Sequence, residues 1–226
     1  MNWEAFWDEQ SAATDAAAQV GRIQAGSNPA LPRRIAEHIG QCLQLSTTDR
    51  LLDVCCGNGT LTALLAPNCQ SVLGVDLSAM LIQKAKQSHQ LSNLHFVKAD
   101  AKLLSGIGGS FHKISLYFSF QYFENYEDGL RVLAEMNSLL LPGGRIFIGD
   151  TPDKRRWWKY YNTPVKWLRY CYQKWRNKEP MGKFWHPDEF VSMAKAVGLE
   201  VEIMAEPIDL PYAWYRFDAV FSKPIH

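Results

Sequence analysis

LLDVCCGNG, residues 51–59, is the stretch of this sequence that decides the fold. Together with Arg50, its first four residues predict a short buried strand, because apolar side chains surround a single acid, Asp53. Gly57 and Gly59 then allow the backbone to turn into a helix and to pass close to a ligand. We therefore expect a strand, a glycine-containing loop and a helix, in that order.

Asp53 indicates what kind of ligand this loop would accept. The carboxyl end of such a strand borders the crevice in which open α/β sheets bind their ligands. A phosphate-binding loop would avoid a carboxylate there, because the following helix N-terminus is used to attract anions. An acid before the loop favours a cationic, amino-bearing ligand. The dinucleotide pattern G-x-G-x-x-G has Thr62 at its third small position here, which weakens a dehydrogenase interpretation.

Strand and helix patterns alternate on both sides of this stretch. Strands are predicted at 50–54, 71–75, 94–97, 113–119 and 145–148, with further candidates at 201–204 and 217–222. Helices are predicted at 1–20, 33–45, 60–65, 78–88, 127–140 and 187–197, and Pro142-Gly143-Gly144 is predicted to turn. Such alternation predicts a doubly wound α/β fold, with helices on both faces of a parallel sheet.

Two more acids follow the next two predicted strands. Asp76 comes 23 residues after Asp53, close to the roughly 20-residue spacing at which a carboxylate binds a ribose hydroxyl pair. Asp100 follows the third strand and would accept a hydrogen bond from an adenine amino group. Acids at three successive strand ends are a stronger signal than one glycine loop.

Length and composition limit the function classes. The 226 residues predict one domain, and 47% hydrophobic with 21% charged residues is ordinary for a globular protein. A net charge of +1 indicates no global attraction to nucleic acid or membranes. The adjacent Cys55 and Cys56 suit neither an ordinary disulfide nor a zinc site, so we predict reduced thiols and no metal.

Targeting signals are not recognised in the sequence. The segment MNWEAFWDEQ has neither the basic start nor the apolar core of a signal peptide. No apolar run approaches the roughly 20 residues that a membrane span needs. We therefore expect a cytoplasmic protein; the sequence does not indicate its oligomeric state.

Four segments together resemble the ordered motifs of class I S-adenosylmethionine-dependent methyltransferases. They are LLDVCCGNG (51–59), LGVDLSAML (73–81), FVKADAKLL (96–104) and LLLPGGRIFIGD (139–150). The resemblance covers roughly residues 48–151, with a weaker match to about 222. It implies a Rossmann-like, seven-stranded mixed sheet whose last strand is antiparallel. It also implies an enzyme that takes a methyl group from S-adenosylmethionine and leaves S-adenosylhomocysteine.

The resemblance also implies roles for individual residues. Gly57 would lie under the methionine part of the cofactor, with Asp53 near its amino group, and Asp76 would hold the ribose hydroxyls. Phe118, with Ser119, would flank the sulfonium. The complete cofactor-binding prediction is Arg22, Asp53, Cys55, Gly57, Asn58, Asp76, Leu77, Met80, Asp100, Ala101 and Phe118.

Two of these residues need comment. Cys55 stands where the family usually has glycine, and we expect a cysteine to fit there provided that its φ is negative. Arg22 lies in the N-terminal helical cap that we predict over residues 1–45. It would pair with the methionine carboxylate, although a solvated surface arginine is the simpler interpretation.

Residues 153–185 carry ten Lys and Arg against two acids, and they hold five of the eight tryptophans. We predict that this segment is a helical lid insertion over the methyl acceptor, where its basic groups would hold an acidic or sugar-like molecule. Two alternatives stay open. The segment suits a nucleic-acid or anionic-lipid surface, or a helical pair whose aromatic side chains pack on the sheet while Lys and Arg face water.

Methyl transfer needs a base only when the acceptor is a hydroxyl or a protonated amine. The catalytic candidates are Tyr122, Asp150 and His186, at strand ends and at the end of the lid. Residues 119–122 read Ser-Phe-Gln-Tyr and not the Asn-Pro-Pro-Tyr type of many nucleic-acid methyltransferases, which favours a small-molecule acceptor. An RNA or protein methyltransferase and a non-catalytic adenosyl-binding module are the alternatives.

Overall fold

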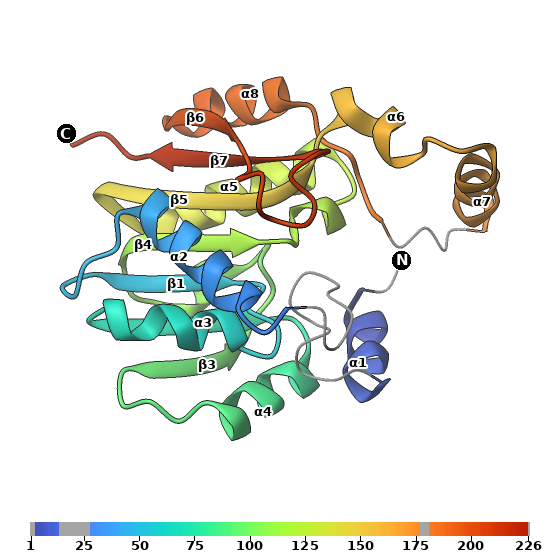
Figure 1. The fold of residues 1–226 in the computed structure, drawn as a ribbon. Helices are drawn as coiled ribbons and strands as arrows, with labels where there is room; N and C mark the ends of the chain where they lie inside the picture. Colours follow the sequence, from blue (N-terminus) through green and yellow to red (C-terminus); the bar gives the residue numbers. More distant parts are fainter. Residues whose placement is uncertain (1–2, 14–27, 177–180, 226) are drawn as a thin grey trace.

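Residues 3–13, 28–176 and 181–225 are described by a computed structural model of the chain (Figure 1). Their sheet has seven strands: β1 (Arg50–Val54), β2 (Ser71–Asp76), β3 (Leu94–Lys98), β4 (Phe111–Tyr117), β5 (Leu140–Pro152), β6 (Glu200–Ala205) and β7 (Arg216–Ser222). Their order across the sheet is β3-β2-β1-β4-β5-β7-β6. The pairs from β3 to β5 are parallel, and β7 runs antiparallel to both β5 and β6. The predicted doubly wound, Rossmann-like mixed sheet is therefore confirmed.

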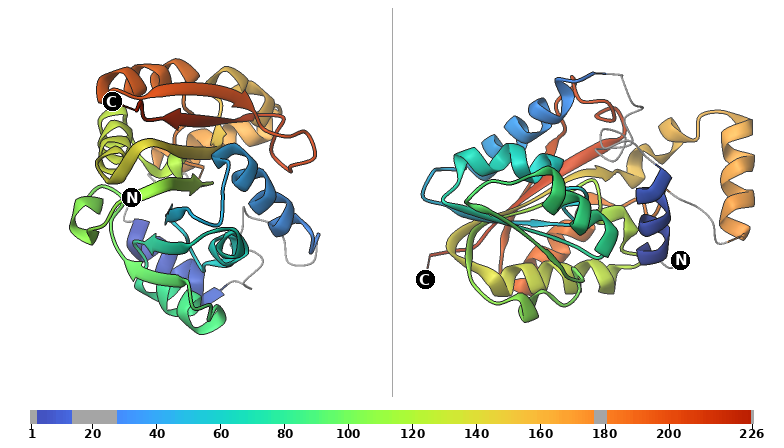
Figure 2. Two further views of the ribbon diagram at one scale, coloured as in Figure 1. Left: turned by 90° about the vertical axis from the view of Figure 1, so that its left-hand side faces the viewer. Right: turned by 90° about the horizontal axis from the view of Figure 1, so that it is seen from below.

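Helices cover both faces of this sheet (Figures 1 and 2). In the described part of the chain they are α1 (Trp3–Ala13), α2 (Leu31–Leu43), α3 (Thr60–Leu65), α4 (Ala79–Ser88), α5 (Tyr126–Leu139), α6 (Trp157–Tyr160), α7 (Pro164–Trp175) and α8 (Pro187–Val197). Successive side chains of a strand point to opposite faces, so Leu51 and Leu52 enter different cores. One core includes side chains of α5 and α8, and the other includes side chains of α2, α3 and α4.

Polar side chains fix where the helices begin at the edge formed by the carboxyl ends of the parallel strands. Ser78 accepts a hydrogen bond from the backbone N–H of Leu81, so α4 begins at Ala79, with two residues between it and the end of β2. Asn125 likewise accepts from the backbone N–H of Asp128 at the start of α5. Such caps satisfy the N–H groups that a helix leaves free in its first turn.

Strand β5 is longer than predicted, since residues 142–144 were expected to form a turn before it. Leu140 pairs with Phe111 and Arg145 pairs with Lys113, so the register shifts between the two pairs. The Pro-Gly-Gly segment bulges out of the ladder there, and strand pairing resumes after it. A proline cannot donate to the ladder, and such residues are tolerated at bulges.

Beyond β5 the chain leaves the sheet as an arm, which we define as residues 154–176 and call the α6–α7 arm. Helix α6 contacts the body, and α7 projects away from it (Figures 1 and 2). Among the residues described, none of the helices combines the length and apolar character needed to cross a membrane.

Candidate functional site

A cavity of about 420 Å³ lies at the carboxyl ends of the central strands. The loop after β1, the ends of β2, β3 and β4, and one side of α1 form its wall. Its volume is within the range of about 300–1,000 Å³ that small-molecule sites occupy. The structure brings these predicted site residues together on the wall: Cys55, Gly57, Asn58, Asp76, Leu77, Asp100, Ala101, Phe118 and Tyr122.

The two glycines of the loop after β1 have different roles, although both have positive φ. A β-carbon on Gly57, at φ +57°, would meet no atom within 4 Å, so this glycine leaves open space beside the cavity. A β-carbon on Gly59, at φ +76°, would lie 2.5 Å from the ring of Phe96. Gly57 therefore gives a ligand access to the backbone, and Gly59 lets the start of α3 pack against β3.

Cys55 does not have the negative φ that we expected. Its φ is +60°, in the left-handed region that costs a residue with a β-carbon about 1 kcal/mol or more. The backbone is held there because the next N–H, of Cys56, donates to the carbonyl oxygen of Val75 at 3.0 Å. Burial raises the pKa of both thiols well above the usual range. The thiols are therefore neutral, and the strain lies beside the cavity, as it does at many functional sites.

Asp76 presents its carboxylate to the cavity from the end of β2. Its Oδ2 accepts from the backbone N–H of Gly57 at 2.9 Å, and its Oδ1 accepts from that of Ser78 at 2.9 Å. Burial raises the pKa of Asp76, and these hydrogen bonds oppose the increase. A carboxylate has about four lone-pair directions, so two remain for a ligand. This geometry suits a pair of neighbouring hydroxyl groups.

Asp53 has a different position from the one predicted. It does not line the cavity, and its two carboxylate oxygens accept hydrogen bonds from Thr62 Oγ1 at 2.6 Å and Ser115 Oγ at 2.7 Å. Burial raises the pKa of Asp53 to about 6, against the effect of these two hydroxyls. Asp53 thus connects β1 to α3 and β4, and it supports the loop from behind.

Helix α1 forms one side of the cavity. Trp3 and Trp7 line it, and their rings lie 4.6 Å and 5.3 Å from that of Tyr122. An ion pair between Glu4 and Lys98, at 2.6 Å, attaches α1 to the end of β3. Neither Trp3 nor Trp7 is among the site residues predicted from the sequence. The available signal was the cluster of aromatic side chains at the start of the predicted cap.

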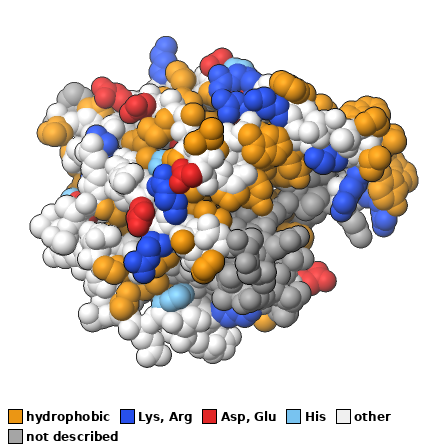
Figure 3. All heavy atoms as spheres, in the orientation of Figure 1, with side chains coloured by type: hydrophobic (Ala, Val, Ile, Leu, Met, Phe, Trp, Pro, Cys, Tyr) orange, Lys and Arg blue, Asp and Glu red, His pale blue; other side chains and the backbone are white. Residues whose placement is uncertain are grey.

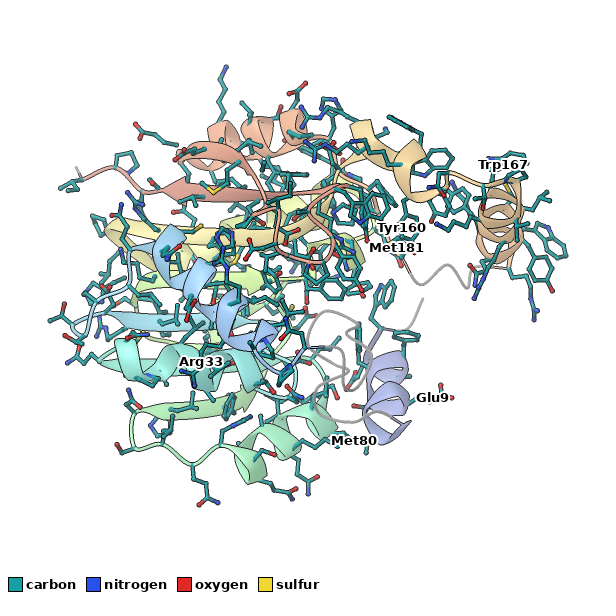
Figure 4. All side chains as sticks on the ribbon, viewed as in Figure 1. Glu9, Arg33, Met80, Tyr160, Trp167 and Met181 are labelled. Carbon is teal, nitrogen blue, oxygen red and sulfur yellow. The ribbon has the colours of Figure 1, made fainter. Side chains whose placement is uncertain are left out.

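Three more predicted site residues lie off the cavity wall. Met80 is on α4 with its side chain exposed (Figure 4). Asp150 forms a buried ion pair with Arg216, whose Nε is 3.2 Å from Asp150 Oδ1. His186 begins α8, where its Nδ1 accepts from the backbone N–H of Asp188 at 3.2 Å. Of the three catalytic candidates, Asp150 and His186 therefore do not line the cavity, whereas Tyr122 does. Arg22 lies outside the described residues.

The predicted lid does not close the cavity in this structure. None of the residues 153–176 and 181–185, the described part of that segment, lines it, and α1 lies over it. Among the described residues that line the cavity, the cationic side chain is that of Lys102, which follows β3 and does not belong to this segment. The basic side chains of the segment are therefore not arranged to hold an acidic acceptor there.

Glu206 is a buried acid that was not predicted from the sequence and that reaches the cavity through Tyr117. The Tyr117 hydroxyl donates to Glu206 Oε1 at 3.2 Å. Burial, followed by repulsion from Asp150 and Asp218, raises the pKa of Glu206 to about 9. Glu206 is therefore protonated at neutral pH. An isolated glutamate between two strands carries no pattern that would identify it.

Part of the chain is similar to known methyltransferases. A family profile described as a methyltransferase domain matches residues 51–144. A demethylmenaquinone methyltransferase of Staphylococcus haemolyticus is 30% identical over 119 residues, which are 51% of this chain and 48% of that protein. A ubiquinone biosynthesis O-methyltransferase of Coxiella burnetii is 29% identical over 158 residues, or 67% of this chain and 63% of that protein. The chain thus spans about half to two thirds of the length of these curated relatives.

Solved structures share the whole fold at low identity. The N-methyltransferase NodS from Bradyrhizobium japonicum, in complex with S-adenosyl-L-homocysteine, aligns with a TM-score of 0.68 and 18% identity, covering 99% of this chain and 100% of that one. A Haloferax volcanii methyltransferase, solved with the activator Trm112, aligns with a TM-score of 0.71 and 17% identity, covering 96% and 97%. Together with the ordered motifs, the matching domain profile and these shared folds support a class I S-adenosylmethionine-dependent methyltransferase.

Proposed function

We propose that this protein transfers the methyl group of S-adenosylmethionine to a small, planar and largely apolar acceptor. The observation that carries the proposal is the aromatic part of the cavity wall. Trp3, Trp7 and Tyr122 form one ring cluster there, and Phe118 and Phe123 also line the cavity. Aromatic faces favour flat, apolar ligands. This acceptor class replaces the acidic or sugar-like acceptor expected from the sequence.

The names of the relatives support an acceptor with a ring. The two relatives described above are named for demethylmenaquinone and for ubiquinone biosynthesis. Their similarity to this chain covers only part of their length, so the names support a class of acceptor and not a particular molecule. A hydroxylated or quinone-like ring is the acceptor that the aromatic wall and these names have in common.

The cavity wall fits the cofactor of the family. The open space at Gly57 would take the amino-acid part, and the two remaining lone-pair directions of Asp76 would take the ribose hydroxyls. Leu77 and Ala101 would border the adenine ring, and Asp100 would accept from its amino group. When bound, the cofactor supplies a methyl group on a positively charged sulfur, and the protein supplies alignment and exclusion of water.

Tyr122 is the residue that we propose to orient the acceptor. It lines the cavity, and its hydroxyl is buried without a hydrogen-bond partner among the residues described. A buried hydroxyl without a partner costs about 1–3 kcal/mol, so a ligand group that pairs with it is favoured. An acceptor hydroxyl bonded to Tyr122 would be held in one direction for the displacement.

A transfer assay with labelled methyl donor tests the proposal. The panel would contain hydroxylated benzoates and hydroquinones, sugar phosphates, and transfer RNA. We expect label on the ring compounds, and about tenfold lower kcat/KM for Tyr122→Phe with unchanged cofactor affinity. Tyr126→Phe removes a hydroxyl away from the cavity wall and is the matched control. Label on RNA or sugar phosphate alone would contradict the acceptor class, and cofactor binding without any transfer would favour a non-catalytic module.

A further inference from the structure

Helix α7 is attached to the rest of the protein along one side only. The ring of Tyr170 lies 4.6 Å from that of Tyr161 and 5.7 Å from that of Trp157, and both partners belong to or border α6. Tyr160 of α6 in turn packs on Tyr215, at the start of β7. No side chain of α7 is buried. Tyr170 therefore marks the inner side of the helix, which faces the body.

The outer side of α7 carries an apolar stripe, which we define as Val165, Leu168, Tyr172 and Trp175. Their spacing of three, four and three residues places them along one face of a helix. At about 100° per residue, the centre of the stripe lies roughly opposite Tyr170. These side chains are 75%, 60%, 55% and 80% exposed, respectively. The most exposed large side chains of α7 therefore face away from the core of the protein.

Basic side chains flank the stripe. Arg169 and Arg176 lie on one flank, and Lys174 lies beyond the other. Residues 154–176 contain eight Lys and Arg and no acid. Within the part of the chain that the structure describes, no carboxylate pairs with the charged residues of α7. Figure 3 shows hydrophobic and basic side chains together at this end of the molecule, and Figure 4 shows Trp167 far from the sheet.

We propose that α7 docks on the surface of an anionic lipid bilayer and lies in its plane, with the apolar stripe among the acyl chains. An apolar stripe flanked by Lys and Arg, with tryptophan at its edge, is the arrangement that binds such an interface. The long basic side chains reach back to the headgroups while their stems cover the apolar boundary. Each Lys or Arg near an anionic surface adds about 1 kcal/mol.

The charge of the arm argues against two other partners. A second copy of the chain would bring the same basic helix against this one, and like charges would repel. A nucleic acid would satisfy Lys and Arg, but its phosphates would leave the aliphatic Val165 and Leu168 in water. A lipid surface offers acyl chains to the apolar stripe and anionic headgroups to the basic side chains.

Docking through α7 would also orient the enzyme. The arm leaves the sheet at the carboxyl end of β5, the edge at which the cavity lies. A bilayer-bound arm therefore keeps the cavity near the surface, where apolar molecules are concentrated. The docking proposal does not depend on which acceptor is methylated, or on whether transfer occurs at all.

Flotation of the full-length protein with vesicles tests the proposal. We expect binding to phosphatidylcholine vesicles that contain phosphatidylglycerol, and little binding to phosphatidylcholine alone. The double variant Leu168→Asp/Trp175→Asp should bind at least about tenfold more weakly, because two apolar anchors are lost and two negative charges gained. Ile208→Asp, at a 97% exposed position outside α7, is the matched control and should bind as the wild type does.

Two further measurements separate the outcomes. Brominated lipid should quench wild-type tryptophan fluorescence, and Trp167→Phe/Trp175→Phe should lose most of that quenching. Unchanged circular dichroism and cofactor affinity in the Asp variants would show that the fold is retained. Three results would overturn the proposal: no binding to anionic vesicles, equal binding of the double variant, or a dimer in solution that Leu168→Asp dissociates. Binding to transfer RNA in place of vesicles would overturn it as well.

Discussion

The loop after β1 and helix α7 lie toward the same edge of the sheet, yet they are stabilised in opposite ways. Around the loop, side chains such as those of Asp53 and Thr62 are buried and hydrogen-bonded, and backbone positions with positive φ are fixed by their neighbours. Helix α7 buries nothing and contacts the body through Tyr170. A substitution in the loop should therefore change folding and cofactor binding together. A substitution on the outer side of α7 should change neither, and should alter only what that side contacts.

The largest expected difference is in folding stability, between substitutions of two tryptophans from the basic, aromatic residues 153–185. Trp185 is fully buried, and its Nε1 donates to the carbonyl oxygen of Phe120 at 3.1 Å. Trp185→Ala should lower the free energy of unfolding by about 4 kcal/mol. Trp175→Ala, on α7, should change it by less than about 0.5 kcal/mol. Urea unfolding measures both, and equal losses would show that the arm packs on the core.

The next largest difference is expected between substitutions of the two glycines in the loop after β1. Gly59→Ala places a methyl group 2.5 Å from the ring of Phe96 at positive φ, and it should cost about 3 kcal/mol of folding stability. Gly57→Ala meets no protein atom, so it should cost about 1 kcal/mol and mainly weaken cofactor binding. Thermal unfolding with and without S-adenosylmethionine separates the two effects. A larger stability loss for Gly57→Ala would contradict the assignment.

Stability should also depend on pH, through the buried groups behind the cavity. His38 lies 2.7 Å from Asp218, and although burial opposes protonation, this hydrogen bond raises its pKa to about 9. Burial raises the pKa of Glu206 to about 9 as well. Both groups hold their protons more tightly in the folded protein than in the unfolded chain, so their contribution is present at low pH and is lost as pH rises through 9.

We therefore expect the free energy of unfolding to fall by several kcal/mol between pH 6.5 and pH 9.5. Glu206→Gln imitates the protonated acid and should remove part of this fall. The α6–α7 arm contributes no such group, so Lys174→Gln should leave the pH dependence unchanged. Urea unfolding across this pH range is the measurement, and a wild-type stability that rises toward pH 9.5 would be inconsistent with these buried protons.

The contrast between the two regions also explains what the sequence could predict. The strands along the chain and the residues after each strand follow from local patterns, so Asp76 and Asp100 could be assigned to the cavity wall from sequence. Asp53 carries the same local signal, but its partners Thr62 and Ser115 come from other elements. Contacts of that kind decide whether a carboxylate faces a ligand or supports a loop.

The other differences between the expected and the observed positions have the same origin. His186 and Asp150 lie at promising positions in the chain, but one caps α8 and the other pairs with Arg216. The basic, aromatic composition of residues 153–185 predicted a lid, because composition does not reveal the direction in which a helix leaves the sheet. The covering role of α1 depends on contacts such as that of Trp3 with Tyr122, far apart in sequence.

The central claim is that the cofactor binds at the carboxyl ends of β1 and β2. Calorimetric titration with S-adenosylmethionine tests this claim most directly. The account predicts that the wild-type protein binds the cofactor at one site. It predicts at least about tenfold weaker binding by Asp76→Ala, or about 1.4 kcal/mol, since the acceptor of the ribose hydroxyls is removed. Glu202→Gln, an exposed acid on β6, should bind as the wild type does. No heat of binding to the wild type, or equal affinity for Asp76→Ala, would contradict the account.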